Sequence, residues 1–197
     1  LAAPLGEDRI VEWEHRTLTR GETFADVQAL PKAQARSVAA GATNTAAKHV
    51  VKIADVLGKD ARGPLAVALQ YTSRPGTRLA RSASSVKIVQ VTDLAISAKI
   101  SPEGSLVWVT KLSTGAPVSG ATVDIRWLDG RLPASHQTDK DGLVKIPASE
   151  FIPKESYQDT SVIFVHSGDD WSYRMVRDVL DGWRYGASYS FYEEGAF

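Results

Sequence analysis

Short runs of β-forming residues follow one another through the second half of the chain, each separated from the next by Gly, Pro, Asp or Ser. They lie at residues 95–100, 106–112, 121–128, 142–147, 161–166 and 171–176. Strands of this length at this spacing, with no long helical period between them, are typical of antiparallel sandwiches rather than of sheets that alternate with helices. This half therefore predicts a β-sandwich.

The first half is more loosely patterned but also favours strands, at residues 9–15, 22–30, 50–53, 64–72 and 85–91. Residues 31–47 predict a long loop with at most one helical turn, and residues 54–58 a tight turn closed by glycine. The fold class expected is all-β, with two tandem antiparallel β-sandwich domains. A well-formed strand ends just before Thr92 and Asp93, which predicts domains at 1–92 and 93–197.

Composition excludes several classes of function. The chain has 197 residues, enough for two domains, with 23 Lys and Arg against 23 Asp and Glu. Without a net positive field, nucleic acid is not an expected partner, and Arg74, Arg78 and Arg81 are scattered in a small-residue loop. No cysteine is present, which excludes disulfides and thiolate chemistry. No apolar stretch is long enough to span a bilayer, so we expect no membrane insertion by this chain.

Three motifs occur in order within about 50 residues: VTDLAISAK at 91–99, SLVWVTKLSTGAPVSGATV at 105–123 and TDKDGL at 138–143. Together they resemble a macroglobulin-like domain of bacterial alpha-2-macroglobulins, most clearly over about residues 86–150. The segments VVKIADVLG, GPLAVALQY and VKIVQVTDL, with Trp13, are similar to the preceding domain of that family. Gly63-Pro64 departs from the more aromatic entry expected there.

The resemblance implies a fragment of a longer protein, cut from two consecutive domains in its N-terminal half. The next domain, with a Tyr-Arg-Pro-Gly-Glu pattern, would then follow Phe197. It implies no enzyme and no cofactor, but a scaffold in a protease inhibitor that traps proteases after bait cleavage. The implied partners are neighbouring domains and the trapped proteases. The implied location is the periplasm, with a lipid anchor to the inner membrane at the N-terminus of the full-length protein.

The thioester of some family members cannot form within a chain that lacks cysteine. A competing hypothesis stays open at this point. The chain could be a ligand-binding or adhesin-type β-sandwich module of a surface protein.

Candidate catalytic and metal residues do not form a convincing set. The histidines His15, His49, His136 and His166 lie in different predicted elements, whereas zinc needs about four converging ligands. Ser167, His166 and Asp169 could be drawn as a triad, but no Gly-x-Ser-x-Gly elbow is present. We therefore expect no catalytic, cofactor-binding or metal-binding residues.

The Asp139-Lys140-Asp141-Gly142 segment is similar to the start of a calcium loop. Glu150 stands at the twelfth position, where the bidentate ligand would be, but it follows a strand containing Pro147 rather than a helix. The favoured interpretation is a plain turn, with Asp139 bonded to its own backbone and Gly142 in a left-handed conformation.

Aromatic residues mark two further regions. A cluster near the C-terminus could bind sugar or a partner, although we favour packing at the edge of the second sandwich and against the next domain. Trp127, Trp171 and Trp183 distinguish these interpretations, because a glycan-binding tryptophan must be exposed. In 106–112, period two predicts Val107 and Val109 on one face and Trp108 on the other. The cluster comprises Asp169, Asp170, Trp171, Trp183, Arg184, Tyr185, Tyr189, Phe191 and Tyr192.

Overall fold

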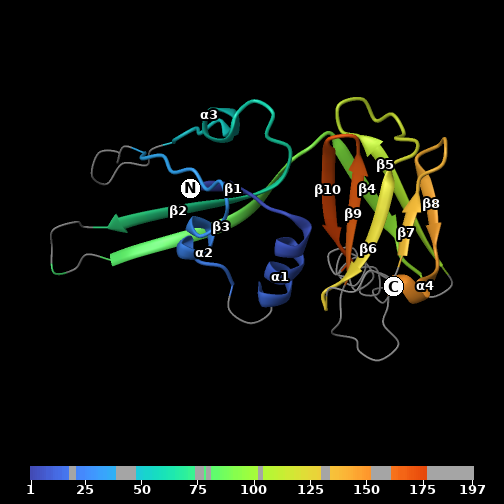
Figure 1. Cartoon of the computed structure of the whole chain (residues 1–197), viewed down its shortest axis with the longest axis horizontal. Coiled ribbons are helices and arrows are strands. Elements are labelled where there is room, and N and C mark those ends of the chain that lie inside the picture. Colours follow the sequence, from blue (N-terminus) through green and yellow to red (C-terminus); the bar gives the residue numbers. More distant parts are fainter. Residues whose placement is uncertain are drawn as a thin grey trace, which may run out of the picture. The chain divides into compact units, whose positions relative to one another are not determined.

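The chain is mostly β, with antiparallel sheets, as the sequence predicts (Figure 1). The computed structural model describes residues 1–17, 21–38, 48–73, 78, 81–101, 104–129, 134–151 and 161–176. It divides into two compact units: unit 1 is Leu1–Gly6 with Arg16–Val91, and unit 2 is Glu7–His15 with Thr92–Phe197. None of the helices in these described ranges is long and apolar enough to cross a membrane.

Unit 2 contains two facing antiparallel sheets. One has the order β4 (Leu94–Lys99), β5 (Ser105–Lys111), β8 (Leu143–Ile146), and the other the order β10 (Asp170–Met175), β9 (Ser161–Ser167), β6 (Thr122–Trp127), β7 (Ala134–Gln137). The sequence predicted six of these strands and missed β7. The one-turn helix α4 (Ala148–Phe151) follows β8.

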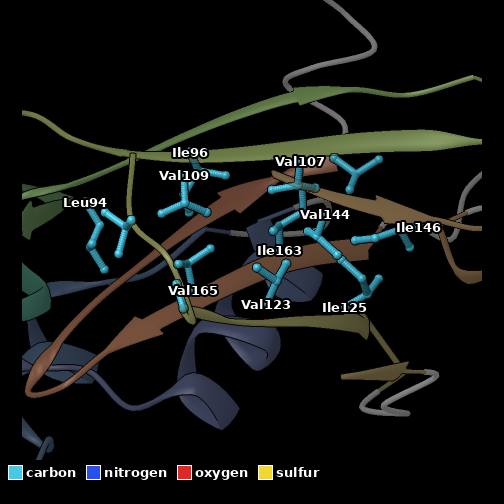
Figure 2. Close-up of a cluster of buried hydrophobic side chains, with 13 residues drawn as sticks. Leu94, Ile96, Val107, Val109, Val123, Ile125, Val144, Ile146, Ile163 and Val165 are labelled. Atoms are coloured by element: carbon cyan, nitrogen blue, oxygen red, sulfur yellow. The ribbon is translucent and has the colours of Figure 1, made fainter. Parts of the chain in front are cut away.

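Aliphatic side chains from both sheets meet between them and form the core of unit 2 (Figure 2). Alternate residues of each strand point inward, as period two requires. Val107 and Val109 of β5 are fully buried, whereas Trp108 between them is 44% exposed, so their predicted orientation is confirmed. The cluster consists of Leu94, Ile96, Val107, Val109, Val118, Ala121, Val123, Ile125, Val144, Ile146, Ile163, Val165 and Val176.

Unit 1 is built on one antiparallel sheet of order β1 (Ala2–Pro4), β2 (Gly63–Ser73), β3 (Arg81–Val91). The predicted strands at 64–72 and 85–91 are confirmed, and β3 begins four residues earlier than expected. Leu65, opposite Val89, is fully buried, while Leu69 further along β2 is 56% exposed. The sheet is therefore covered only toward the end where β1 pairs.

The strand predicted at 9–15 is wrong, because this segment lies within helix α1 (Glu7–Thr17). Ile10, Val11 and Trp13 are β-formers, but they also fall on one side of a helix, and all three are buried. Glu7 and Asp8 in the first turn favour the helix because carboxylates complement the positive end of its dipole.

Two more strand predictions in unit 1 are wrong. Residues 22–30 contain helix α2 (Phe24–Gln28), which begins at a capping box in which Thr23 and Asp26 bond each other's backbone amides. Residues 50–53 lead instead into the one-turn helix α3 (Ile53–Leu57), which Gly58 closes at φ 90°. The described part of unit 1 is thus one sheet with helices rather than a pair of facing sheets.

Candidate functional site

The outer face of the β10-β9-β6-β7 sheet is covered, although it points away from the core of unit 2. Phe164 on β9 is fully buried, and its register partner Tyr173 on β10 is only 8% exposed. Helix α1, which belongs to unit 2 through Glu7–His15, makes hydrogen bonds to this face through Glu7 and Glu14. Its side chains Ile10 and Trp13 are 0% and 2% exposed. A helix from the N-terminal part of the chain is therefore packed on the sandwich.

Charged contacts hold the N-terminal turn of α1. Arg126 of β6 donates from Nη1 to Glu7 Oε2 at 3.1 Å and from Nη2 to Asp8 Oδ1 at 2.7 Å. His166 Nε2 lies 2.7 Å from Glu7 Oε1, so both oxygens of Glu7 are engaged. We call Glu7, Asp8, Asp124, Arg126 and His166 the α1 attachment site.

Aromatic rings support the two cationic side chains of the attachment site. The His166 ring stacks on Trp171, with centroids 5.6 Å apart and planes 11° from parallel. The Arg126 guanidinium carbon lies 5.9 Å from the centroid of Phe164, within cation–π range. Phe164 also contacts Trp171 and Tyr173 at centroid distances of 6.2 and 6.0 Å. These ring contacts hold His166 and Arg126 in the positions in which they bind Glu7 and Asp8 of α1.

The protonation of these groups reflects their pairing. The hydrogen bond to Glu7 raises the pKa of His166 above its ordinary value, against the opposing effect of burial. The hydrogen bond from His166 lowers the pKa of Glu7, helped by Arg126. Burial disfavours the charge on Arg126, but its bonds to Asp8 and Glu7 outweigh this and raise its pKa. The chemistry available here is charge pairing.

A second set of contacts pins the chain where β4 of unit 2 begins. The Asp93 carboxylate accepts from the Ser113 amide at 2.7 Å and the Ser113 hydroxyl at 2.8 Å. The Asp93 amide donates to Asp170 Oδ2 at 2.7 Å, and its carbonyl accepts from the Leu112 amide at 2.7 Å. The bond from the Ser113 hydroxyl lowers the pKa of Asp93. The VTDL motif thus has a structural role as a fixed entry into the sandwich.

The four histidines have separate surroundings. His166 bonds Glu7, His136 Nε2 lies 2.6 Å from Glu150 Oε2, and His49 is exposed. The side chain of His15 lies outside the described residues. Within the described ranges, no three His, Asp or Glu side chains gather as metal ligands would. Ser167 follows His166 directly in β9, and neighbouring side chains of a strand point to opposite faces of the sheet.

The turn interpretation of residues 139–142 is confirmed. Asp139 Oδ1 accepts from the amides of Asp141 and Leu143, each at 2.9 Å, and Gly142 has φ 74°. Trp108 Nε1 donates to the Asp141 carbonyl at 3.1 Å. One carboxylate oxygen of Asp139 thus accepts two backbone amides and closes the turn.

We expect calcium to leave the thermal unfolding of the chain unchanged, because Asp139 Oδ1 is held by two backbone amides and Glu150 does not follow in the helix of a calcium loop. A site at 100 times its dissociation constant would add about 2.7 kcal/mol of stability, which a melting curve resolves. The measurement is unfolding with calcium or chelator, with Asp141→Ala as the control. A stabilisation by calcium that disappears in this variant would contradict the prediction.

Of the aromatic residues that could bind a ligand, Trp127 and Trp171 lie within the described part of the chain. Trp127 Nε1 donates to the Glu150 carbonyl at 2.8 Å, and Trp171 is half-buried against His166. Trp171 therefore packs at the edge of the sandwich, as we favoured. Asp170 accepts the Asp93 amide bond. Trp183, Arg184, Tyr185, Tyr189, Phe191 and Tyr192 lie outside the described residues.

Sequence reasoning missed the attachment site. Glu7 and Asp8 are a helix-start signal, but the residues that follow them, 9–15, predict a strand. Arg126 stands 119 residues from Glu7, and nothing in the spacing of a single sequence links them. Only the alternation of Arg126 with the core residues Val123 and Ile125 could have placed it on the outer face.

Comparisons with known proteins give one family. The model of the bacterial alpha-2-macroglobulin MG3 domain matches residues 91–191, just over half of the 197 residues. Among solved structures, native alpha-2-macroglobulin from Escherichia coli spanning domains NIE-MG1 is similar, with a TM-score of 0.61 and 14% identity over 85% of this chain and 76% of that chain. A second Escherichia coli structure, spanning MG0-NIE-MG1, has a TM-score of 0.43 and 12% identity over 61% and 34%. A search of curated protein sequences finds no significant match.

Proposed function

The chain belongs to the bacterial alpha-2-macroglobulin family, and on that premise we propose that it is a non-catalytic scaffold in a protein that traps proteases after bait cleavage. Its two domains meet near residues 92 and 93, and the segment Glu7–His15 belongs with the second of them. Its partners are the neighbouring domains of the same chain and, for the whole protein, the captured proteases. The whole protein acts in the periplasm, held at the inner membrane by a lipid.

The observation that carries this proposal is the path of the chain through helix α1. Residues on both sides of Glu7–His15 belong to unit 1, yet this segment belongs to unit 2. The chain therefore passes between the units three times, after Gly6, after His15 and after Val91. Within unit 2, Arg126 and His166 hold α1, and Asp93 fixes the start of β4. A sandwich whose polar side chains bond other parts of the same chain supports a structural role for this fragment.

The competing hypothesis of a ligand-binding or adhesin-type module receives less support. Trp127 donates its indole proton to a backbone carbonyl, and Trp171 is stacked on His166. His166 covers one face of the Trp171 ring, whereas a glycan-binding platform needs an open aromatic face.

The test uses the full-length parent protein and a broad protease. We expect the parent to protect a large protein substrate while leaving a small peptide substrate cleavable, because a cage excludes by size. The 197-residue chain alone should protect neither. Stoichiometric inhibition of a protease by this chain alone, lost on a surface-loop substitution that preserves folding, would refute the scaffold role.

A pair of matched variants connects the role to α1. Arg126→Gln removes both bonds to α1 and should weaken size-selective protection by the parent. Arg62→Gln changes an exposed arginine that bonds the nearby carbonyls of Lys59 and Ala61, and it should leave protection intact. Equal protection by the two variants, with α1 released in Arg126→Gln, would show that protection does not need the attachment of α1.

A further inference from the structure

We propose that His166 makes the attachment of helix α1 sensitive to pH, so that α1 is held most firmly while the imidazole is protonated and Glu7 is ionised. The proposal adds regulation to the scaffold role of α1 and rests on that role for its meaning. Its test involves no protease, so either idea can fail without the other.

The charges around His166 favour its protonated form. Helix α1 contributes Glu7, bonded to the ring, and Asp8, bonded to Arg126. Strand β6 contributes Asp124 and Arg126, and Asp124 also attracts a charge on the ring. Three carboxylates thus face one guanidinium and one imidazole, so a proton on His166 reduces an excess of negative charge.

The other titratable groups near His166 do not take over the role of its proton in balancing the nearby negative charge. From β10, Tyr173 donates its hydroxyl to Glu14 Oε1 of α1 at 3.3 Å, and Asp170 binds the Asp93 amide. Arg9 and Glu12 of α1 pair with each other. His136, on β7, pairs with Glu150 of α4. Asp124 Oδ1 is buried without a hydrogen-bond partner in the described structure. Protonated His166 is therefore the titratable group whose positive charge offsets the negative charge of the Asp124 carboxylate.

The direction of the pH effect follows from linkage. Because the pKa of His166 is raised above 6.5 in the folded state, its contribution is complete below 6.5 and is lost as pH rises through the raised value. Because the pKa of Glu7 is lowered below 4.5, its contribution is present above 4.5 and is lost as pH falls through the lowered value. Attachment is therefore firmest between about pH 4.5 and pH 6.5, and it weakens as the pH rises above this range.

The experiment measures amide hydrogen exchange of α1 in the 197-residue chain at about pH 6 and about pH 8, corrected for intrinsic exchange, with NMR titration of the His166 ring. We expect the opening of α1 to increase several-fold at the higher pH, and the ring to titrate above its ordinary value. Glu7→Gln should return the titration toward that value.

Two further variants keep the result decisive. His166→Gln retains a hydrogen-bond donor without a titratable proton, so its α1 opening should not change across this range. His136→Gln removes the other carboxylate-bonded histidine of unit 2, and it should keep the wild-type pH dependence. Equal opening of wild-type α1 at both pH values, or an unchanged pH dependence in His166→Gln, would overturn the proposal.

Discussion

Gly142→Ala is expected to lower the free energy of unfolding of unit 2 by about 3 kcal/mol or more. Gly142 has φ 74°, where an L side chain is strained. A Cβ there would also stand 2.4 Å from the Val109 carbonyl oxygen and 3.1 Å from the Val118 amide. The backbone would have to move apart.

The movement would break named hydrogen bonds. The Val109 amide donates to the Gly142 carbonyl at 2.8 Å, and the Val109 carbonyl accepts from the Val118 amide at 3.0 Å. Val109 and Val118 both belong to the core cluster, so displacing them disturbs packing as well. The measurement is urea unfolding of the wild type and the variant.

Gly115→Ala is the matched control. Gly115 has φ 72°, but a Cβ there would meet nothing within 4 Å. Its substitution should lower stability by only about 1 kcal/mol, the conformational part of the effect. A similar loss in both variants would show that φ, not the collision with Val109, decides the effect at Gly142.

Phe164→Ala is expected to lower the free energy of unfolding by about 3–5 kcal/mol, as for other large buried aromatic side chains. Phe164 lies on the outer face of β9, where it is fully buried and its ring contacts those of Trp171 and Tyr173. Its removal also takes away the ring beneath Arg126, which holds Glu7 and Asp8. Exchange protection of α1 should therefore fall together with global stability.

Trp108→Ala tests whether position rather than aromatic size causes this loss. Trp108 is larger than Phe164, but it is 44% exposed and makes one indole hydrogen bond, to Asp141. We expect a loss of about 1–2 kcal/mol and unchanged protection of α1. Calorimetry and hydrogen exchange measure the two quantities. If Trp108→Ala lowered the exchange protection of α1 as much as Phe164→Ala does, α1 would not be held by the outer face of β9.

Local pattern by itself determined most of the sandwich of unit 2. Side chains alternate along a strand, so Val107 and Val109 had to share a face that excludes Trp108, and Asp139 and Gly142 carry the conformational preferences of a turn. Those signals come from neighbours in the sequence. The ordered motifs from VTDL to TDKDG likewise pointed to the family that the model match identifies.

Only the tertiary structure decided that residues 9–15 form a helix and that Arg126 binds its first turn. Ile10, Val11 and Trp13 suit a strand by propensity, but they lie in a helix in which all three are buried. Glu7 gains its partners Arg126 and His166 from strands more than a hundred residues away. Propensity is a weak preference summed over neighbours, whereas burial and charge pairing act between residues that only folding brings together.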